Sequence, residues 1–281
     1  MEEEQMQLAL DLDDQFIVVQ DNSLVMGNYD MTAIEQKLLL ILLSTIKKDD
    51  EELKTISFRV RDLADLMGIT PYSLYRDLKK ICKSIVGKMV ELQNKQGDWI
   101  VFNIISYAKY RQSKGVVELK LNNDAKPYVL KLKELFTAFK LEQVLDLESK
   151  YAIRIYQITK SNIYKKTFVL ELETLKKQLK LTQKSYSLYG NIKKKVIEPA
   201  LAEINEKTDI SLSYEEIKIG RKVEMLKFKV SQKKNNPVKI KPITKSNNKV
   251  SESNFKESSF NNFEPRQYDY DKLEKKLLGW E

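Results

Sequence analysis

The stretch from Lys184 to Thr208 combines lysine and asparagine side chains with the spacing of a helix. Residues four apart form one apolar stripe: Ile192, Val196, Ala200 and Ile204. The opposite face carries polar side chains: Ser187, Asn191, Lys194, Lys195 and Glu198. In a DNA major groove, lysine binds guanine or phosphate, and asparagine pairs with adenine. The pattern predicts a helix that reads DNA; the alternative is an ordinary amphipathic helix with a solvated basic face.

Other kinds of chemistry find little support in the residue types. The chain of 281 residues has no histidine, which excludes Ser-His-Asp triads, Cys-His pairs, His-based zinc sites and nicking enzymes with a His-pair metal site. The single cysteine, Cys82, lies in a helical pattern and is expected to be a half-buried structural thiol. Neither core region has a grouped Asp/Glu motif, so we expect no enzyme activity, no cofactor and no metal site.

The charge balance indicates a polyanionic partner. Lys and Arg number 49 against 40 Asp and Glu, which gives a net charge of +9. The first fourteen residues are acidic, so the rest of the chain is more basic than the average. The longest apolar run, Leu38–Leu43, is far shorter than the ~20 residues of a membrane span. With no signal-peptide pattern and one cysteine, we expect a soluble cytoplasmic protein with no membrane partner.

Behind an acidic tail over residues 1–20, residues 21–140 are predicted to form a first winged-helix domain. Thr32 and Glu35 have the spacing of a capping box at the start of a long buried helix. Gly68 is expected to end a short helix, and Thr70 with Pro71 to begin the next. The expected elements are helix Met31–Lys47, strand Thr55–Phe58, helices Val60–Met67 and Pro71–Val86, and strands Met89–Gln93, Trp99–Tyr107 and Val116–Leu121.

The same order of elements returns in residues 141–232, which predicts a second winged-helix domain. We expect a helix over Asp124–Phe139 before it, and then helix Tyr151–Ile163, strand Thr167–Leu170, helices Leu172–Leu179 and Ser187–Glu206, and a hairpin of Ile210–Glu215 with Val223–Val230. Pro199 either kinks the long helix or begins a second helical segment. The fold class is therefore α+β, mainly helical, with two tandem winged-helix domains.

The C-terminal residues differ in composition from both domains. Residues 233–262 are rich in Lys, Asn, Ser and Pro, which predicts a disordered linker. Residues 263–281 contain an apolar set that could dock as a short helix, either on a partner or back on the body of the protein. The sequence leaves these two possibilities open.

Several segments resemble the Rep initiators of theta-replicating, iteron-containing plasmids, which have two tandem winged-helix domains. The similarity covers roughly residues 21–230. It includes the segments EQKLLLILLS, FRVRDLADLMGI, PYSLYRDLKK and LEQVLDLESKYAIRIYQI. The most specific segment is SLYGNIKKKVIEPALAEINEKTDI, in which VIEPALAEIN follows a basic run.

The resemblance implies a role in starting replication. Such a protein binds direct repeats at an origin as a monomer and an inverted repeat as a dimer, the latter to repress its own gene. It helps to melt an AT-rich segment and recruits the host initiator and the replicative helicase. The homodimer is in equilibrium with the monomer, and no catalytic site is implied.

The resemblance also assigns roles to residues. The second winged helix would make the main base contacts through Lys184, Tyr186, Ser187, Asn191, Lys194 and Lys195. The first would add phosphate contacts and some base contacts through Tyr72, Arg76, Lys79, Lys80 and Lys83. Arg154 is expected to contact phosphate, and Val116–Leu121 is the strand that we expect at the dimer interface.

The wing of the second domain supplies three more candidates from its position alone. Wing tips commonly reach the minor groove or the backbone of DNA, and this tip holds Lys218, Arg221 and Lys222. Two other classes of protein remain alongside an initiator. A transcription regulator could use the same tandem winged helices. A nickase, recombinase or primase would need a tyrosine or serine nucleophile with metal-binding carboxylates or a cationic cluster.

Overall fold

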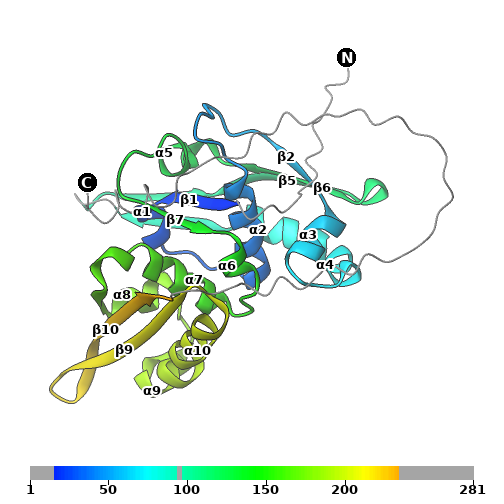
Figure 1. Ribbon diagram of the computed structural model, residues 1–281. Helices are drawn as coiled ribbons and strands as arrows, with labels where there is room; N and C mark the ends of the chain where they lie inside the picture. Colours follow the sequence, from blue (N-terminus) through cyan, green and yellow to red (C-terminus); the bar gives the residue numbers. More distant parts are fainter. Residues whose placement is uncertain (1–15, 94–96, 234–281) are drawn as a thin grey trace. The chain divides into compact units, whose positions relative to one another are not determined.

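The computed structural model describes residues 16–93 and 97–233 (Figure 1). The predictions for the acidic tail before residue 16, the linker over 234–262 and the C-terminal segment 263–281 therefore lie outside the described residues. Within the described part, the expected pair of tandem winged-helix domains is confirmed.

The first winged helix is built on a three-stranded antiparallel sheet with the order β2-β6-β5. Its elements are β2 (Ile56–Arg59), α3 (Val60–Leu66), α4 (Pro71–Val86), β5 (Ile105–Arg111), the 3-10 turn Gln112–Lys114 and β6 (Val116–Leu121). Gly68 follows α3 with a φ of 64°, so a glycine is needed there. The Thr70 side chain accepts a hydrogen bond from Ser73 N at 3.4 Å, and Pro71 begins α4, as the sequence predicts.

A separate hairpin lies between α4, the recognition helix of this domain, and the β5–β6 hairpin, which is its wing. It is formed by β3 (Met89–Gln93) and β4 (Trp99–Asn103), which pair antiparallel. The sequence prediction made Trp99–Tyr107 one strand and did not separate this hairpin from the wing. The structure corrects this, because the wing that adjoins the β2-β6-β5 sheet is the next hairpin, β5 with β6.

The expected helix over Asp124–Phe139 is wrong. The chain forms the 3-10 turn Asn123–Ala125, the short helix α5 (Lys126–Val129) and then β7 (Phe136–Lys140). Strand β7 pairs with β1 (Ile17–Asp21), so Ile17–Gln20, which the prediction placed in the acidic tail, belong to a strand. Two left-handed residues, Lys131 and Leu135, lie between α5 and β7. Such residues are incompatible with a continuous right-handed helix.

A buried helix forms the centre of the first domain. Thr32 and Glu35 make the predicted capping box of α2 (Ala33–Ser44), and every residue from Glu35 to Leu43 is buried. Before it comes α1 (Asn22–Met26), capped by the Asp21 carboxylate, which accepts from Ser23 N at 2.7 Å. After β7 comes the short helix α6 (Glu142–Leu145).

The second winged helix repeats the sheet of the first. Its elements are β8 (Thr167–Glu171), α8 (Leu172–Gln178), the 3-10 turn Lys184–Ser187, α9 (Tyr189–Ile192), the π-helical turn Lys193–Ile197, α10 (Glu198–Lys207), β9 (Ile210–Ile219) and β10 (Lys222–Gln232). The strand order is β8-β10-β9, which corresponds to β2-β6-β5. The long β9–β10 hairpin projects at the lower left of Figure 1.

Helix α7 (Lys150–Lys160), followed by the 3-10 turn Ile163–Lys165, packs against elements on both sides of it along the chain. All residues from Ala152 to Thr159 are buried. The helix contacts α1, α2 and β7 before it and α10 after it. One apolar core therefore runs through both winged helices.

Pro199 begins a new helical segment, which is one of the two outcomes expected for it. It is the second residue of α10, directly after the π-helical turn Lys193–Ile197, whose i→i+5 bonding replaces the α-helical pattern just before the proline. The chain nevertheless stays helical from Tyr189 to Lys207, because the π-helical turn joins α9 to α10. The recognition helix of the second domain, defined here as Tyr189–Lys207, is thus continuous in spite of the proline.

Candidate nucleic-acid interface

Helix α4 carries all five residues predicted for the first domain on its outer face. The apolar residues Leu74, Leu78, Cys82 and Ile85 are buried. The exposed residues are Tyr72, Arg76, Lys79, Lys80 and Lys83. The Tyr72 side chain is 77% exposed, so it is not a core tyrosine. Arg76 forms an ion pair with the adjacent Asp77 at 2.8 Å. Within the described part of the chain the lysines of this face form no ion pair, so they can meet phosphate.

Cys82 is more deeply buried than the half-buried position expected for it. Only 8% of the residue is exposed, on the apolar side of α4. Burial raises the pKa of its thiol to about 11, so the thiol stays protonated and unreactive at neutral pH. This environment fits the predicted structural role.

The wing of the first domain adds exposed polar residues that the sequence prediction missed. The turn between β5 and β6 exposes Gln112, Ser113 and Lys114. Gly115 closes the turn with a φ of 60°, and a Cβ there would lie 2.9 Å from the hydroxyl of Tyr75 on α4. The segment Lys114–Gly115 is a turn signal that could have located this wing.

Four cationic or hydroxyl side chains are exposed at the predicted recognition face of the second domain. They are Lys184, Ser187, Lys194 and Lys195. Ser187 donates its hydroxyl hydrogen to the Lys184 carbonyl at 2.8 Å, which fixes the turn that leads into the recognition helix. The apolar stripe predicted for this helix is buried at all four positions.

A polar cluster joins the recognition helix to the wing. Tyr189 Oη and Lys193 Nζ each donate to Glu216 Oε1 on β9, both at 2.9 Å. The hydrogen bond from Lys193 is the main cause that lowers the pKa of Glu216. Burial, together with the bonds to Tyr214 and Glu216, raises the pKa of Tyr189. The cluster thus holds the helix and the wing in one arrangement with a neutral phenol and an ionised carboxylate.

Two candidates of the second domain are engaged inside the protein. Tyr186 is only 8% exposed, and its hydrogen bond with Tyr151 contributes, after burial, to raising the pKa of Tyr151. The structure therefore contradicts the predicted DNA contact of Tyr186, because this side chain packs in the core. Asn191 is half-buried and donates from Nδ2 to the Ser185 carbonyl at 2.7 Å. One amide hydrogen of Asn191 is thus already used within the protein.

The phosphate contact expected of Arg154 is wrong. Arg154 is 2% exposed, and its guanidinium donates to the carbonyls of Val25 and Gly27 at 2.9 and 2.8 Å and to the hydroxyl of Tyr29. Its carbon Cζ lies 3.9 Å from the centroid of the Tyr29 ring. Burial lowers the pKa of Arg154, and the contact with Tyr29 opposes that shift. Arg154 therefore braces α7 against the segment that follows α1.

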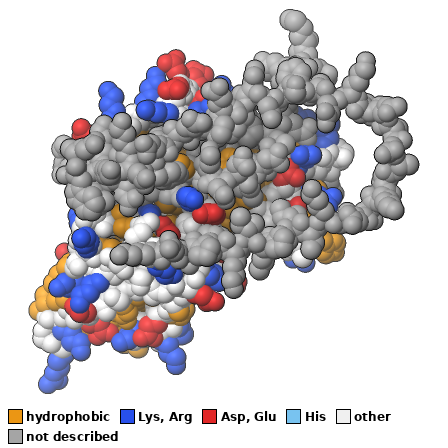
Figure 2. All heavy atoms as spheres, viewed as in Figure 1, with side chains coloured by type: hydrophobic (Ala, Val, Ile, Leu, Met, Phe, Trp, Pro, Cys, Tyr) orange, Lys and Arg blue, Asp and Glu red, His pale blue; other side chains and the backbone are white. Residues whose placement is uncertain are grey.

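The wing tip of the second domain is exposed and basic, as expected. Gly220 and Arg221 form the two-residue turn of the β9–β10 hairpin, and Gly220 has a φ of 63°. Lys218, Arg221 and Lys222 are all exposed around this turn. Figure 2 shows Lys and Arg side chains projecting at this end of the molecule, at the lower left of the view.

The strand expected at the dimer interface is not available for strand pairing. Val116–Leu121 is β6, which is hydrogen-bonded to β2 on one side and to β5 on the other. Both of its edges are therefore occupied within the chain. The edges of this sheet are β2 and β5.

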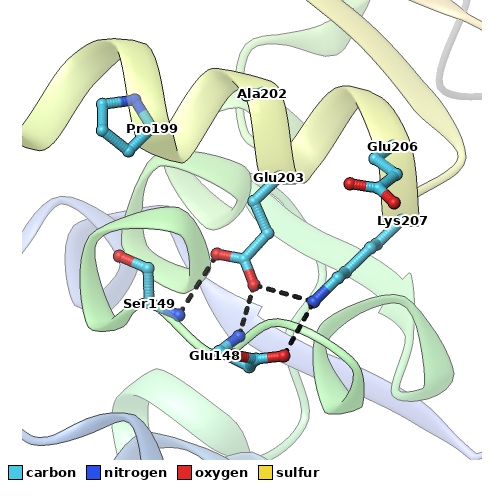
Figure 3. A pocket seen from close by; sticks show the side chains of 7 residues that line it. All are labelled: Glu148, Ser149, Pro199, Ala202, Glu203, Glu206 and Lys207. Carbon is cyan, nitrogen blue, oxygen red and sulfur yellow. Dashed lines mark hydrogen bonds and ion pairs between the residues drawn. The ribbon is translucent and has the colours of Figure 1, made fainter.

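A shallow pocket elsewhere on the second domain has the wrong charge for DNA. It is lined by Glu148, Ser149, Pro199, Ala202, Glu203, Glu206 and Lys207 (Figure 3). Three carboxylates against one ammonium repel phosphate. Within the described residues, no group of three or more His, Cys, Asp or Glu residues is arranged to hold a metal ion. In the same part of the chain, no helix has the length and apolar character needed to cross a membrane.

The fold and the two basic faces define a tandem winged-helix protein with a recognition helix and a wing in each half. Residues 17–160 match the family described as "Initiator Replication protein, WH1", and residues 171–230 match "Initiator Rep protein, WH2". The chain belongs to this family of initiator replication proteins. The first match includes α7, whereas the sequence prediction placed the boundary between the domains at residue 140.

Individual relatives agree with this assignment. A replication initiation protein of Escherichia coli is 28% identical over 226 residues, which cover 77% of this chain and 70% of the relative. The PI protein of Escherichia coli is 30% identical over 221 residues, which cover 65% and 71%. A crystal structure of the Pi initiator protein in complex with iteron DNA has a similar fold, with a TM-score of 0.67 and 23% identity over 80% of this chain and 100% of that one.

Proposed function

We propose that the chain starts plasmid replication by binding short direct repeats of duplex DNA at the origin. One observation carries this proposal: the chain belongs to the initiator family, and each of its two winged helices exposes lysines on the recognition helix. Two such modules on one chain suit two adjacent major-groove faces about 34–36 Å apart. The iteron DNA bound by the Pi initiator protein of similar fold also supports it.

The two domains contribute different parts of the binding energy. Lysines on α4 and at the wing tips neutralise phosphates, which gives affinity that falls with salt and carries no sequence information. Lys194 and Lys195 on the recognition helix of the second domain reach base edges. Asn191 pairs with adenine through the part of its amide that the Ser185 carbonyl does not use.

The finer steps of initiation form part of the same proposal. The bound protein helps to melt an AT-rich segment and recruits the host initiator and the replicative helicase. As a dimer it binds an inverted repeat and represses its own gene. The similarity to a replication initiation protein of Escherichia coli supports this assignment over a transcription regulator without a replication role.

Binding to flanking DNA tests the proposal directly. Short direct repeats beside the gene supply the duplex, and fluorescence anisotropy compares one repeat with a scrambled duplex at two salt concentrations. We expect tight, repeat-specific binding by a monomer. Binding only to an inverted repeat by a dimer would favour a repressor, and binding without preference would contradict sequence-specific initiation.

We also propose that the chain acts without cutting DNA. Incubation with supercoiled origin DNA and Mg²⁺ should leave the plasmid supercoiled. Reproducible nicking that is lost when one tyrosine is substituted would contradict this part of the proposal.

A further inference from the structure

A large apolar side chain is exposed where the recognition helix of the second domain begins. Leu188 is 67% exposed, and it directly precedes α9. A single exposed leucine is common on protein surfaces and needs no explanation by itself. Leu188 differs from such a residue in its surroundings, because Lys184, Lys194 and Lys195 are exposed on the same segment of chain.

The glycine two residues later has no role in the fold. A Cβ at Gly190 would meet no atom within 4 Å, and its φ is not in the left-handed region. At Gly27, by contrast, a Cβ would lie 2.6 Å from Leu92 Cδ2, so the packing there excludes a side chain. Glycine inside a helix is less stable than alanine. The backbone at Gly190 is therefore kept bare at a cost to the helix.

Bare backbone and an exposed leucine suit one feature of duplex DNA. In the major groove, the C5-methyl group of thymine is the one apolar group on the base edges, and apolar side chains contact it. Glycine is used where a backbone must approach a ligand closely. The lysines of this segment outnumber the acids near it: Lys193 binds Glu216 at 2.9 Å and lies 4.0 Å from Glu198, and three more lysines of the segment are exposed.

We propose that Leu188 reads a thymine methyl group in the major groove, and that Gly190 lets the helix backbone approach the same base pair. This inference rests on the proposed function and adds a specificity determinant to it. Readout of thymine by Leu188 is independent of the lysines, because it depends on a methyl group and not on charge.

A double-mutant cycle between protein and DNA tests the contact with thymine. Each thymine of a duplex carrying one flanking repeat is replaced in turn by deoxyuridine, which removes only the methyl group. Wild-type protein should lose about fourfold in affinity at one position, the effect expected for one buried methyl group. The Leu188→Ala variant should bind the unmodified duplex more weakly and show no further loss at that position.

Val169→Ala is the matched control, because Val169 is a 50% exposed apolar residue on β8, outside the recognition helix. This variant should keep the wild-type deoxyuridine profile. Repeat-specific binding with the same profile in Leu188→Ala would overturn this inference and leave the proposed function standing. Absence of any repeat preference in the wild-type protein would overturn both.

A second variant separates binding from folding. Gly190→Ala introduces a methyl group into open space and a better helix former, so its melting temperature should equal or exceed that of the wild type. Its affinity for the repeat should nevertheless fall by about tenfold, the effect of adding one methyl group to a closely packed contact. Unchanged affinity in this variant would overturn the role of Gly190.

Discussion

Arg154 shows how a buried charge is held without a carboxylate, by its two Nη atoms, while its Nε has no hydrogen-bond partner among the described residues. Its guanidinium meets two backbone carbonyls, one phenol oxygen and the face of the Tyr29 ring. Arginine keeps its charge at any physiological pH, so burial costs energy that these dipoles must offset. The acceptors in turn depend on Arg154, because Val25 and Tyr29 are themselves buried.

We predict that Arg154→Met destabilises the protein without altering its DNA contacts. The substitution leaves buried oxygens without a donor, at a cost on the order of 1–3 kcal/mol for each. Urea denaturation measures the free energy of unfolding. The value for Arg154→Lys should lie between those of Arg154→Met and the wild type, because one ammonium group reaches fewer acceptors than a guanidinium. A shallower salt dependence of DNA binding with unchanged stability would instead indicate a phosphate contact.

Lys80 on α4 should behave in the opposite way. It is exposed on the outer face of the helix and is expected to contact phosphate. Lys80→Ala should weaken binding to the repeat and to a scrambled duplex alike, and reduce the slope of log K against log salt by about one unit. Lys133→Ala, an exposed lysine outside both recognition helices, is the control. A loss confined to the repeat would assign Lys80 to base readout.

At the scale of elements, local signals in the sequence predicted the structure well. The capping box at Thr32, the glycine after α3 and the Thr-Pro start of α4 each act through neighbouring backbone groups. Burial of the apolar stripe on the recognition helix follows from spacing alone. These features depend only on residues close together in the chain, so the sequence alone predicts them.

The failures of the prediction depend on contacts between residues far apart in sequence. Phe136–Phe139 was taken as the end of a helix because the strand that pairs with β7, Ile17–Asp21, lies at the other end of the domain. Arg154 and Tyr186 look like surface residues by type, and only tertiary packing buries them. Trp99–Tyr107 was predicted as one strand, although it contains β4 and part of β5, which pair with different strands. Register between distant strands cannot be read from local periodicity.

The N-terminal end of α7 depends on a carboxylate from another helix. Glu203 on α10 accepts from the backbone N–H groups of Glu148 and Ser149 at 2.5 and 3.2 Å (Figure 3). Lys207 lies 3.3 Å from the same carboxylate. Burial lowers the pKa of the nearby Lys37, and the charge on Glu203 is among those that oppose this shift. The carboxylate therefore satisfies two donors and compensates nearby ammonium groups.

Substitution of this carboxylate is predicted to lower stability and leave DNA binding intact. Glu203→Ala should cost on the order of 1–3 kcal/mol, because hydrogen bonds to a charged acceptor are lost. Glu206→Ala is the matched control, since Glu206 is exposed on the same helix and lines the same pocket. Thermal unfolding followed by circular dichroism measures both variants. Equal melting temperatures for the two would contradict the capping role of Glu203.

At the scale of the whole molecule, α7 links the two winged helices, because it contacts elements of both. On the side of the first domain, Gln157 accepts from Gln20 at 3.1 Å, and Arg154 holds the segment after α1. On the side of the second, Tyr156 and Lys160 donate to Asp209 at 2.9 and 3.0 Å. Neither winged helix therefore has a complete core without α7.

Because both winged helices share α7, we predict that they unfold in one cooperative transition. Chains of this length often unfold domain by domain, because separate cores can open independently. Here exposure of α7 would remove buried contacts from both halves at once. Hydrogen exchange of the full chain in increasing urea should therefore show α4 and α10 losing protection at the same concentration. Asp209→Ala, which removes contacts only on the side of the second domain, should lower that midpoint for both helices together. Loss of protection in α10 while α4 stays protected would mean that the two cores are energetically independent, with α7 belonging to only one of them.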